Sequence, residues 1–190
     1  MFQGCIIVKN DGGDDTPVVL NLSPKPEIPM SDELVRSKKG DMIALLPQGW
    51  HYLNVEEDAS SDIIAVAVNP DYNLSAVFST IRNSDELDEV VTREGLLGLA
   101  RQSLANHAKK TAGAVKQVGK YSTINMGSQS FAQYEFSNGS PLITKAVVFI
   151  SSIDEYYEFA LIPMNVSGKP LPSQPEIDKI FRSILTTVQY

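Results

Sequence analysis

Two histidines and one cysteine are the side chains best suited to chemistry in this chain of 190 residues. His51 lies in an aromatic segment and His107 near the end of a predicted helix, and no spacing links either one to a nucleophile or a metal ligand. The sequence has no phosphate-binding loop, GxGxxG, HExxH or GxSxG motif. We therefore expect no catalytic residue set, no metal site and no cofactor.

Cys5 is the only cysteine, so neither an internal disulfide nor a thiolate metal cage can form. Gly4 before it matches part of a bacterial lipoprotein cleavage site, and lipidation of Cys5 would anchor the protein to a membrane. Phe2 and Gln3 fit that site poorly, which favours Cys5 as a small buried residue opening a strand. The chain as it stands has no charged and apolar leader, which predicts a cytoplasmic protein, with the anchored form as the alternative.

The segment Leu46-Pro-Gln-Gly-Trp50 is the most distinctive short feature of the sequence. Gly49 permits a tight turn, after which the only tryptophan stands next to two further ring side chains. Trp50, His51 and Tyr52 are therefore candidates for lining a pocket or anchoring a partner. The alternative, which we favour, is that Trp50 fills the core at the start of a strand.

Charge is unevenly distributed along the chain. The net charge is −7 and the pI is about 4.8, which argues against nucleic-acid binding. Residues 54–94 hold ten acidic and two basic side chains, whereas residues 95–134 hold five basic and no acidic ones. If the fold gathers these bases, they would attract an acidic protein partner; ordinary solvation and helix-dipole complementation are the favoured alternative. The five bases are Arg101, Lys109, Lys110, Lys116 and Lys120.

Composition indicates one folded domain. Hydrophobic residues make up 43% and charged residues 21%, and the mean hydropathy is −0.09, which excludes a disordered chain. No apolar run reaches the roughly 20 residues of a transmembrane helix. We expect residues 1–40 to be an extension, with a hairpin of Gly4 to Val8 and Val18 to Leu22, then a proline-rich connector and a short helix from Ser31 to Lys38.

Residues 41–190 are predicted to form a single α+β domain. Periodicity predicts strands at 42–46, 50–55, 62–69, 74–82, 115–126, 130–136, 142–151 and 155–162. A long helix is expected from 84 to about 110, in which Gly95 and Gly98 would permit close packing on a sheet. A second helix begins at the capping box of Ser173 and Glu176 and carries an apolar stripe through the chain end.

This order of elements resembles the PsbP-like superfamily. The residues that carry the resemblance are Met42-Ile-Ala-Leu-Leu-Pro-Gln-Gly-Trp50, Val77-Phe-Ser-Thr-Ile-Arg82, Phe131-Ala-Gln-Tyr-Glu-Phe136, Tyr156-Tyr-Glu-Phe-Ala-Leu161 and Ile180-Phe-Arg-Ser-Ile-Leu185. The resemblance implies an antiparallel β-sheet flanked by helices on both faces, an α/β/α sandwich. The superfamily includes photosystem II extrinsic subunits, a Ran-binding nuclear transport factor, bacterial DcrB-like lipoproteins and chaperones of secreted effectors.

Proteins of this superfamily bind and assemble other proteins and share no catalytic residue set. The photosynthetic members carry a Pro-Pro-x-x-x-Trp stretch before the last helix, where this chain has Leu171-Pro-Ser-Gln-Pro175, which argues against a photosystem role. We therefore expect a non-enzymatic accessory protein whose partner is another protein. The alternative is a small-molecule-binding protein or a hydrolase with a pocket near Trp50.

Overall fold

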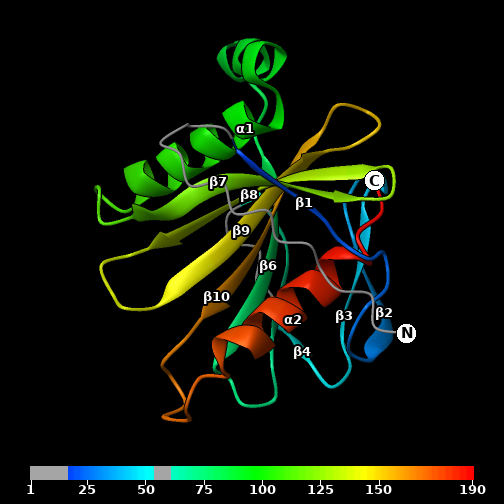
Figure 1. The fold of residues 1–190 in the computed structure, drawn as a ribbon, viewed down its shortest axis with the longest axis vertical. Coiled ribbons are helices and arrows are strands. Elements are labelled where there is room, and N and C mark those ends of the chain that lie inside the picture. The colour runs from blue at the N-terminus through cyan, green and yellow to red at the C-terminus, as the bar shows by residue number, and fades with distance from the viewer. Residues whose placement is uncertain (1–16, 54–60) are drawn as a thin grey trace.

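The computed structural model describes residues 17–53 and 61–190, and within these ranges it contains ten strands and two helices (Figure 1). In chain order they are β1 (Val18–Asn21), β2 (Met30–Arg36), β3 (Ile43–Pro47), β4 (His51–Leu53), β5 (Ile63–Val68), β6 (Leu74–Ile81), α1 (Asp85–Lys110), β7 (Lys116–Met126), β8 (Gln129–Ser137), β9 (Ile143–Ile150), β10 (Tyr156–Pro163) and α2 (Gln174–Leu185). Cys5 and the predicted strand from Gly4 to Val8 lie outside the described residues.

Eight of these strands form one sheet in the order β1-β7-β8-β9-β10-β6-β5-β4, and β2 pairs with β3 separately. Neighbours in the large sheet are antiparallel, except that β1 runs parallel to β7. The eight strands predicted between residues 42 and 162 are confirmed, with bounds that differ slightly at the described ends. Residues 54 and 55 of the predicted strand 50–55 lie outside the described residues. The molecule therefore has a mixed α+β fold built around a large sheet.

The predicted helix from Ser31 to Lys38 is wrong, because this segment forms strand β2. Its side chains are mostly exposed, but Val35 is buried and pairs in register with Ala44 of β3. Pairing with β3 satisfies the backbone groups and places Val35 in the core, and this tertiary gain exceeds the weak local preference for helix. The second strand of the predicted hairpin, from Val18 to Leu22, is present as β1. The strand with which β1 pairs among the described residues is β7.

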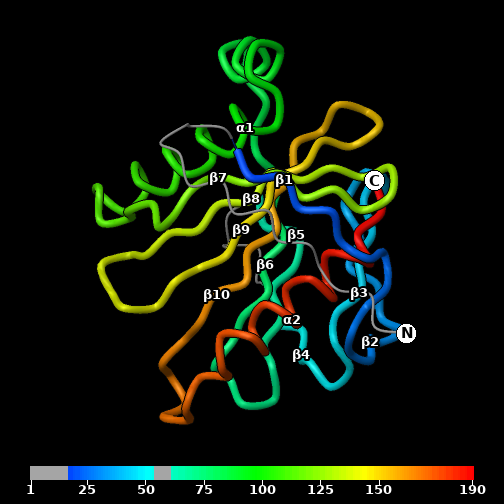
Figure 2. The backbone as a smooth tube through the Cα atoms, viewed as in Figure 1, coloured from blue at the N-terminus to red at the C-terminus, as the bar shows by residue number. Residues whose placement is uncertain are grey.

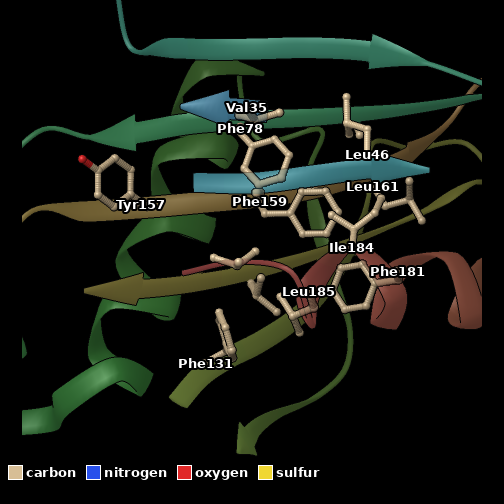
Figure 3. Packing of buried hydrophobic residues seen from close by; sticks show 14 of the residues in the cluster. Val35, Leu46, Phe78, Phe131, Tyr157, Phe159, Leu161, Phe181, Ile184 and Leu185 are labelled. Atoms are coloured by element: carbon tan, nitrogen blue, oxygen red, sulfur yellow. The ribbon is translucent and has the colours of Figure 1, made fainter. Parts of the chain in front are cut away.

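The buried side chains form two clusters. The α2 cluster joins Phe181 and Ile184 of α2 to Phe78, Phe131 and Phe159 of the sheet (Figure 3). The rings of Phe78 and Phe159 stack with centroids 4.8 Å apart, and Phe159 and Phe181 stack at 5.4 Å. The apolar stripe predicted for this helix is thus confirmed at these positions, although the helix ends at Leu185 and not at the chain end.

The α1 cluster joins Leu87, Leu99 and Ala100 of α1 to a different set of sheet residues, which includes Tyr134 and Tyr156. Successive side chains of a strand point in opposite directions. On β10, accordingly, Tyr157, Phe159 and Leu161 belong to the α2 cluster, whereas Tyr156 and Ala160 belong to the α1 cluster.

Helix α1 is present where predicted, and the Ser84 hydroxyl caps it by accepting a hydrogen bond from the Leu87 N–H at 3.2 Å. It is interrupted at Gly95, whose φ of 63° and ψ of −151° are not helical. Figure 2 shows the two helical parts turned relative to each other. The predicted packing role of Gly95 is therefore wrong: this residue breaks the helix in a backbone conformation that other residues rarely adopt.

Candidate functional site

A pocket of about 600 Å³ lies between α2 and the turn that follows β3. Its walls come from three segments that are far apart in the sequence. The lining residues are Ile28 and Pro29 of the connector before β2, Pro47, Gln48, Gly49 and Trp50 of the turn, and Pro172, Glu176, Lys179 and Ile180 at the start of α2.

Local backbone geometry brings the turn and the connector together. Gly49 has a φ of 82°, which allows the tight turn that the sequence predicted. The Trp50 N–H donates to the Pro47 carbonyl at 3.2 Å, and the Gln48 N–H donates to the Pro29 carbonyl at 3.0 Å. Trp50 is half-buried and packs against the α2 cluster, so it both supports the core and forms a wall of the pocket.

The described pocket lining is mainly apolar. The Glu176 carboxylate accepts hydrogen bonds from the Ser173 N–H at 2.8 Å and from the Ser173 hydroxyl at 2.7 Å, and these bonds lower the pKa of Glu176. Lys179 is exposed and takes part in no ion pair with any described residue. Because isoleucine, proline and tryptophan make up most of the described lining, this pocket is suited to binding apolar groups.

The sequence predicted that Trp50, His51 and Tyr52 act together. Of these three, Trp50 is the one that belongs to the described pocket lining. His51 is exposed and stacks on Tyr72, with ring centroids 6.1 Å apart. Tyr52 is 37% exposed, and its pKa is raised by partial burial and by the negative charge of Glu33. Strand alternation directs His51 away from the side on which Trp50 and Tyr52 lie.

The predicted basic residues of α1 lie on its exposed surface. The Arg101 guanidinium binds the Glu94 carboxylate at 2.7 Å and lies 5.8 Å from the ring centroid of Tyr121. These contacts engage Arg101 within the protein. Lys109 and Lys110 are exposed in the last turn of α1, where positive charge favours the helix dipole.

Lys116 and Lys120 are exposed on β7. Lys116 pairs with Ser137 of β8, and alternation along β8 places Ser137 on the same side of the sheet as Phe131 of the α2 cluster. Lys120 lies in the irregular stretch of β7 between Val118 and Ser122. Lys116 is therefore separated by the sheet from the basic residues of α1.

A buried polar network beneath α1 was not predicted. The Glu158 side chain of β10 is 5% exposed. One of its oxygens, Oε2, accepts hydrogen bonds from the Tyr134 hydroxyl at 2.6 Å and from the Ser103 hydroxyl, and Oε1 lies 2.8 Å from Nε2 of His107. The His107 ring also stacks on Phe136, with centroids 5.0 Å apart.

Electrostatics keep the Glu158 carboxylate ionised. Burial by itself raises its pKa, but the hydrogen bond and charge of His107, together with the Ser103 and Tyr134 hydroxyls, hold the pKa below its usual value of 4.5. Burial and the same carboxylate raise the pKa of Tyr134 well above 10. Ser103 and His107 bind opposite oxygens of Glu158, and the histidine is therefore not placed to activate the serine as in a hydrolase triad.

Two features of the sequence indicate this network. Ser103 and His107 are four residues apart and so lie on one side of the helix. Glu158 is a lone carboxylate within the otherwise apolar strand β10. A charge at such a position requires hydrogen-bond partners from the element that covers it.

The described residues thus define an α+β protein with a PsbP-like fold. The solution structure of cyanobacterial PsbP (CyanoP) from Synechocystis sp. PCC 6803 is similar, with a TM-score of 0.57 and 16% sequence identity, over 83% of this chain and 92% of that chain. This similarity confirms the PsbP-like α+β fold that the sequence motifs predicted. No protein-family model matches the sequence, and no curated protein matches it significantly. Within the described ranges, neither helix combines the length and the apolar character needed to cross a membrane.

Proposed function

We propose that the chain is a non-enzymatic protein-binding or assembly accessory protein, and that it receives an apolar part of another protein in the Trp50 pocket. The observation that carries this proposal is the lining of the pocket. Most of its walls are aliphatic, proline and tryptophan residues, and the polar side chains of the described lining are Gln48, Glu176 and Lys179. Apolar concave surfaces of this kind bind ligands by burying their apolar area.

Affinity capture from the native lysate tests the proposal. The tagged chain is expected to retain a specific protein, because burying apolar area in the pocket favours association, and Trp50→Ala should lose it. The exposed Tyr72→Ala variant, which also removes one ring but lies outside the described pocket lining, is the matched control. Failure of the native chain to retain any specific protein would contradict the proposal.

Exposed bases on both sides of the sheet contribute to the same proposal by long-range attraction of an acidic partner, although they do not form one patch. Lys109, Lys110 and Lys116 are exposed, so reversing all three to glutamate should cost little stability beyond the favourable helix-dipole interaction of Lys109 and Lys110. Such a variant should bind the captured partner more slowly, and added salt should no longer weaken its binding. Association rates that are unchanged at low salt would remove the bases from the interface.

The alternative function, a small-molecule-binding protein or hydrolase, is favoured by the volume of the pocket. About 600 Å³ lies within the range of roughly 300–1,000 Å³ that is typical of ligand pockets. Screening small molecules by the fluorescence of Trp50, the only tryptophan, would test it. Saturable binding of one compound, with no protein captured, would favour this alternative, and hydrolysis of that compound would establish the enzyme version.

The finer predictions on architecture and location belong to the same proposal. We infer that helices cover both faces of the sheet as an α/β/α sandwich, because alternate residues of β10 supply the α1 and α2 clusters. Membership of the DcrB-like or Ran-binding branches and a bacterial origin remain predictions. Lipidation of Cys5 also remains one, and the intact mass of the native protein tests it, because acyl chains add mass and cleavage removes Met1 to Gly4.

A further inference from the structure

We propose that the Trp50 pocket binds an extended segment of the partner in which apolar side chains are accompanied by an acidic residue, and that this acid pairs with Lys179. The inference rests on the proposed function and specifies the chemistry of the partner. It follows from the shape of the pocket, the composition of its floor and the charges along α2.

The shape favours a chain segment over an enclosed small molecule. Pro29, Gln48, Glu176 and Lys179 line the pocket and are also exposed to solvent, whereas Pro47 is buried. The site is therefore a groove that is open along the side of α2. An extended segment can enter and leave such a groove, with its side chains directed toward the floor and its backbone remaining near solvent.

The partly buried residues of the lining form the floor of the groove, and they favour apolar side chains in the occupant. Ile28, Trp50, Pro172 and Ile180 are all partly buried, so each still has apolar surface that a ligand can cover. Prolines have no backbone N–H, and three of the lining residues are proline, which leaves few donors for a polar ligand. Covering apolar surface contributes roughly 25 cal/mol per Å², and it is the main source of affinity that this lining offers.

The charges along α2 favour one acid in the segment. Asp178 pairs with Lys145 at 2.9 Å, Arg182 pairs with Glu27 at 3.3 Å, and Glu176 is bonded to Ser173 as described above. Lys179 lies among these residues, at the groove, and has no ion-pair partner among the described residues. Electrostatic complementarity therefore favours an occupant with a negative charge near Lys179.

Peptide selection on the full chain tests this inference. Short random peptides displayed on phage are selected, and the best tryptophan-free sequence is synthesised with its acidic residue and with asparagine or lysine in its place. Binding is followed by the fluorescence of Trp50, which reports directly on the groove because no other tryptophan is present. We expect the acidic peptide to bind about fivefold more tightly than its asparagine form, as for a partly exposed ion pair.

A charge swap separates pairing from a change in the fold. Lys179→Glu should lower the affinity for the acidic peptide and raise the affinity for its lysine form. A merely structural effect would lower the affinity for both peptides. Lys38→Glu is the matched control, because Lys38 is also exposed and lies outside the described pocket lining. The inference would be overturned if the selected peptides contain no acidic residue. It would also be overturned if acidic peptides do not change Trp50 fluorescence, or if they bind Lys179→Glu as tightly as the native chain. The same Lys179-dependent response to octanoate, with no peptide selected, would also overturn it, because the occupant would then be an amphiphilic anion.

Failure of this inference can be distinguished from failure of the proposed function. A protein captured from the lysate with equal strength by the native chain and by Lys179→Glu would leave the accessory role intact and exclude the ion pair with Lys179, and Trp50→Ala would then decide whether the pocket is the interface. Absence of any captured protein would contradict the accessory role itself, whatever the peptides show.

Discussion

The α2 and α1 clusters use neighbouring residues of the same strand but are held together by different forces. Phe159 of β10 stacks between Phe78 and Phe181 in the α2 cluster. Glu158, the preceding residue, is a buried carboxylate bound by Tyr134, Ser103 and His107 beneath α1. One cluster is stabilised by apolar packing, whereas the other includes a set of directional hydrogen bonds.

Because different forces hold the two clusters together, we expect them to respond differently to mutation. Apolar packing tolerates changes of shape if the volume is kept and loses stability mainly when a cavity forms. A buried polar network depends on every donor, because each missing partner leaves a desolvated charge less well compensated. The following changes, from the largest expected effect to the smallest, test this comparison.

Phe181→Ala should cause the largest loss, because Phe181 is 2% exposed and its ring stacks on Phe159. Removing a buried aromatic ring costs about 3–5 kcal/mol in the free energy of unfolding, measured by urea denaturation. Phe181→Leu is the control, and it should cost less than half as much because it retains most of the apolar volume. Equal losses in the two variants would contradict packing as the dominant force.

Tyr134→Phe should destabilise the protein by about 1–3 kcal/mol, since it removes one donor from a buried carboxylate and changes little volume. Tyr157→Phe is the matched variant in the α2 cluster. Its hydroxyl bonds to Asp41 at 2.7 Å, but Asp41 is only half-buried and keeps the hydroxyl of Ser37 as a donor. Tyr157→Phe should therefore lower the free energy of unfolding by less than Tyr134→Phe. Equal losses in the two variants would contradict the difference between the two clusters.

Gly95→Ala tests whether the break in α1 is required where the helix crosses its cluster. No atom lies within 4 Å of the position that the added Cβ would take, so the expected cost arises from the backbone conformation. Placing a residue with a side chain in this sparsely populated backbone conformation costs about 1–3 kcal/mol. Urea denaturation measures the loss, and circular dichroism reports the helix content. A stronger helical signal with no loss of stability would show that α1 can straighten without harm.

The smallest expected effect is a pH dependence that Glu158→Gln removes. The pKa of Glu158 is lower in the folded state than its usual 4.5, so its charge stabilises the folded state above that pH. This contribution is lost as the pH falls through the folded-state pKa. The difference in unfolding free energy between native protein and variant should thus be greatest near neutral pH and narrow below about 4.5. A difference that is constant with pH would contradict the role of His107, Ser103 and Tyr134 in holding this charge.

The fold was predictable where local signals agree with the final packing. Alternating apolar residues predicted the strands from 42 to 162, and the residues around Ser173 predicted the start of α2. The segment from Met30 to Arg36 failed because its state is decided by pairing with β3. The parallel pairing of β1 with β7 has no local signal at all, since the two strands are far apart in the chain.

The candidate site was predictable in one of its three walls. A glycine followed by the only tryptophan indicated an unusual turn, and that turn does line the pocket. Ile28, Pro172 and Ile180 come from distant segments that only the tertiary fold brings to Trp50, so no spacing could reveal them. Glu158 is recognisable as a lone carboxylate in an apolar strand, but only the tertiary fold brings its partners on α1 and β8 to it.

The position of β10 in the sheet has a consequence for how the chain folds. β10 pairs with β6 on one side and with β9 on the other, although α1 and three strands separate β6 from β10 in the sequence. The centre of the sheet therefore closes only after β10 has been synthesised. Folding dominated by such non-local pairing takes roughly milliseconds to seconds. Until then β6 has an unpaired edge, and nascent or truncated chains that lack β10 should be prone to aggregation.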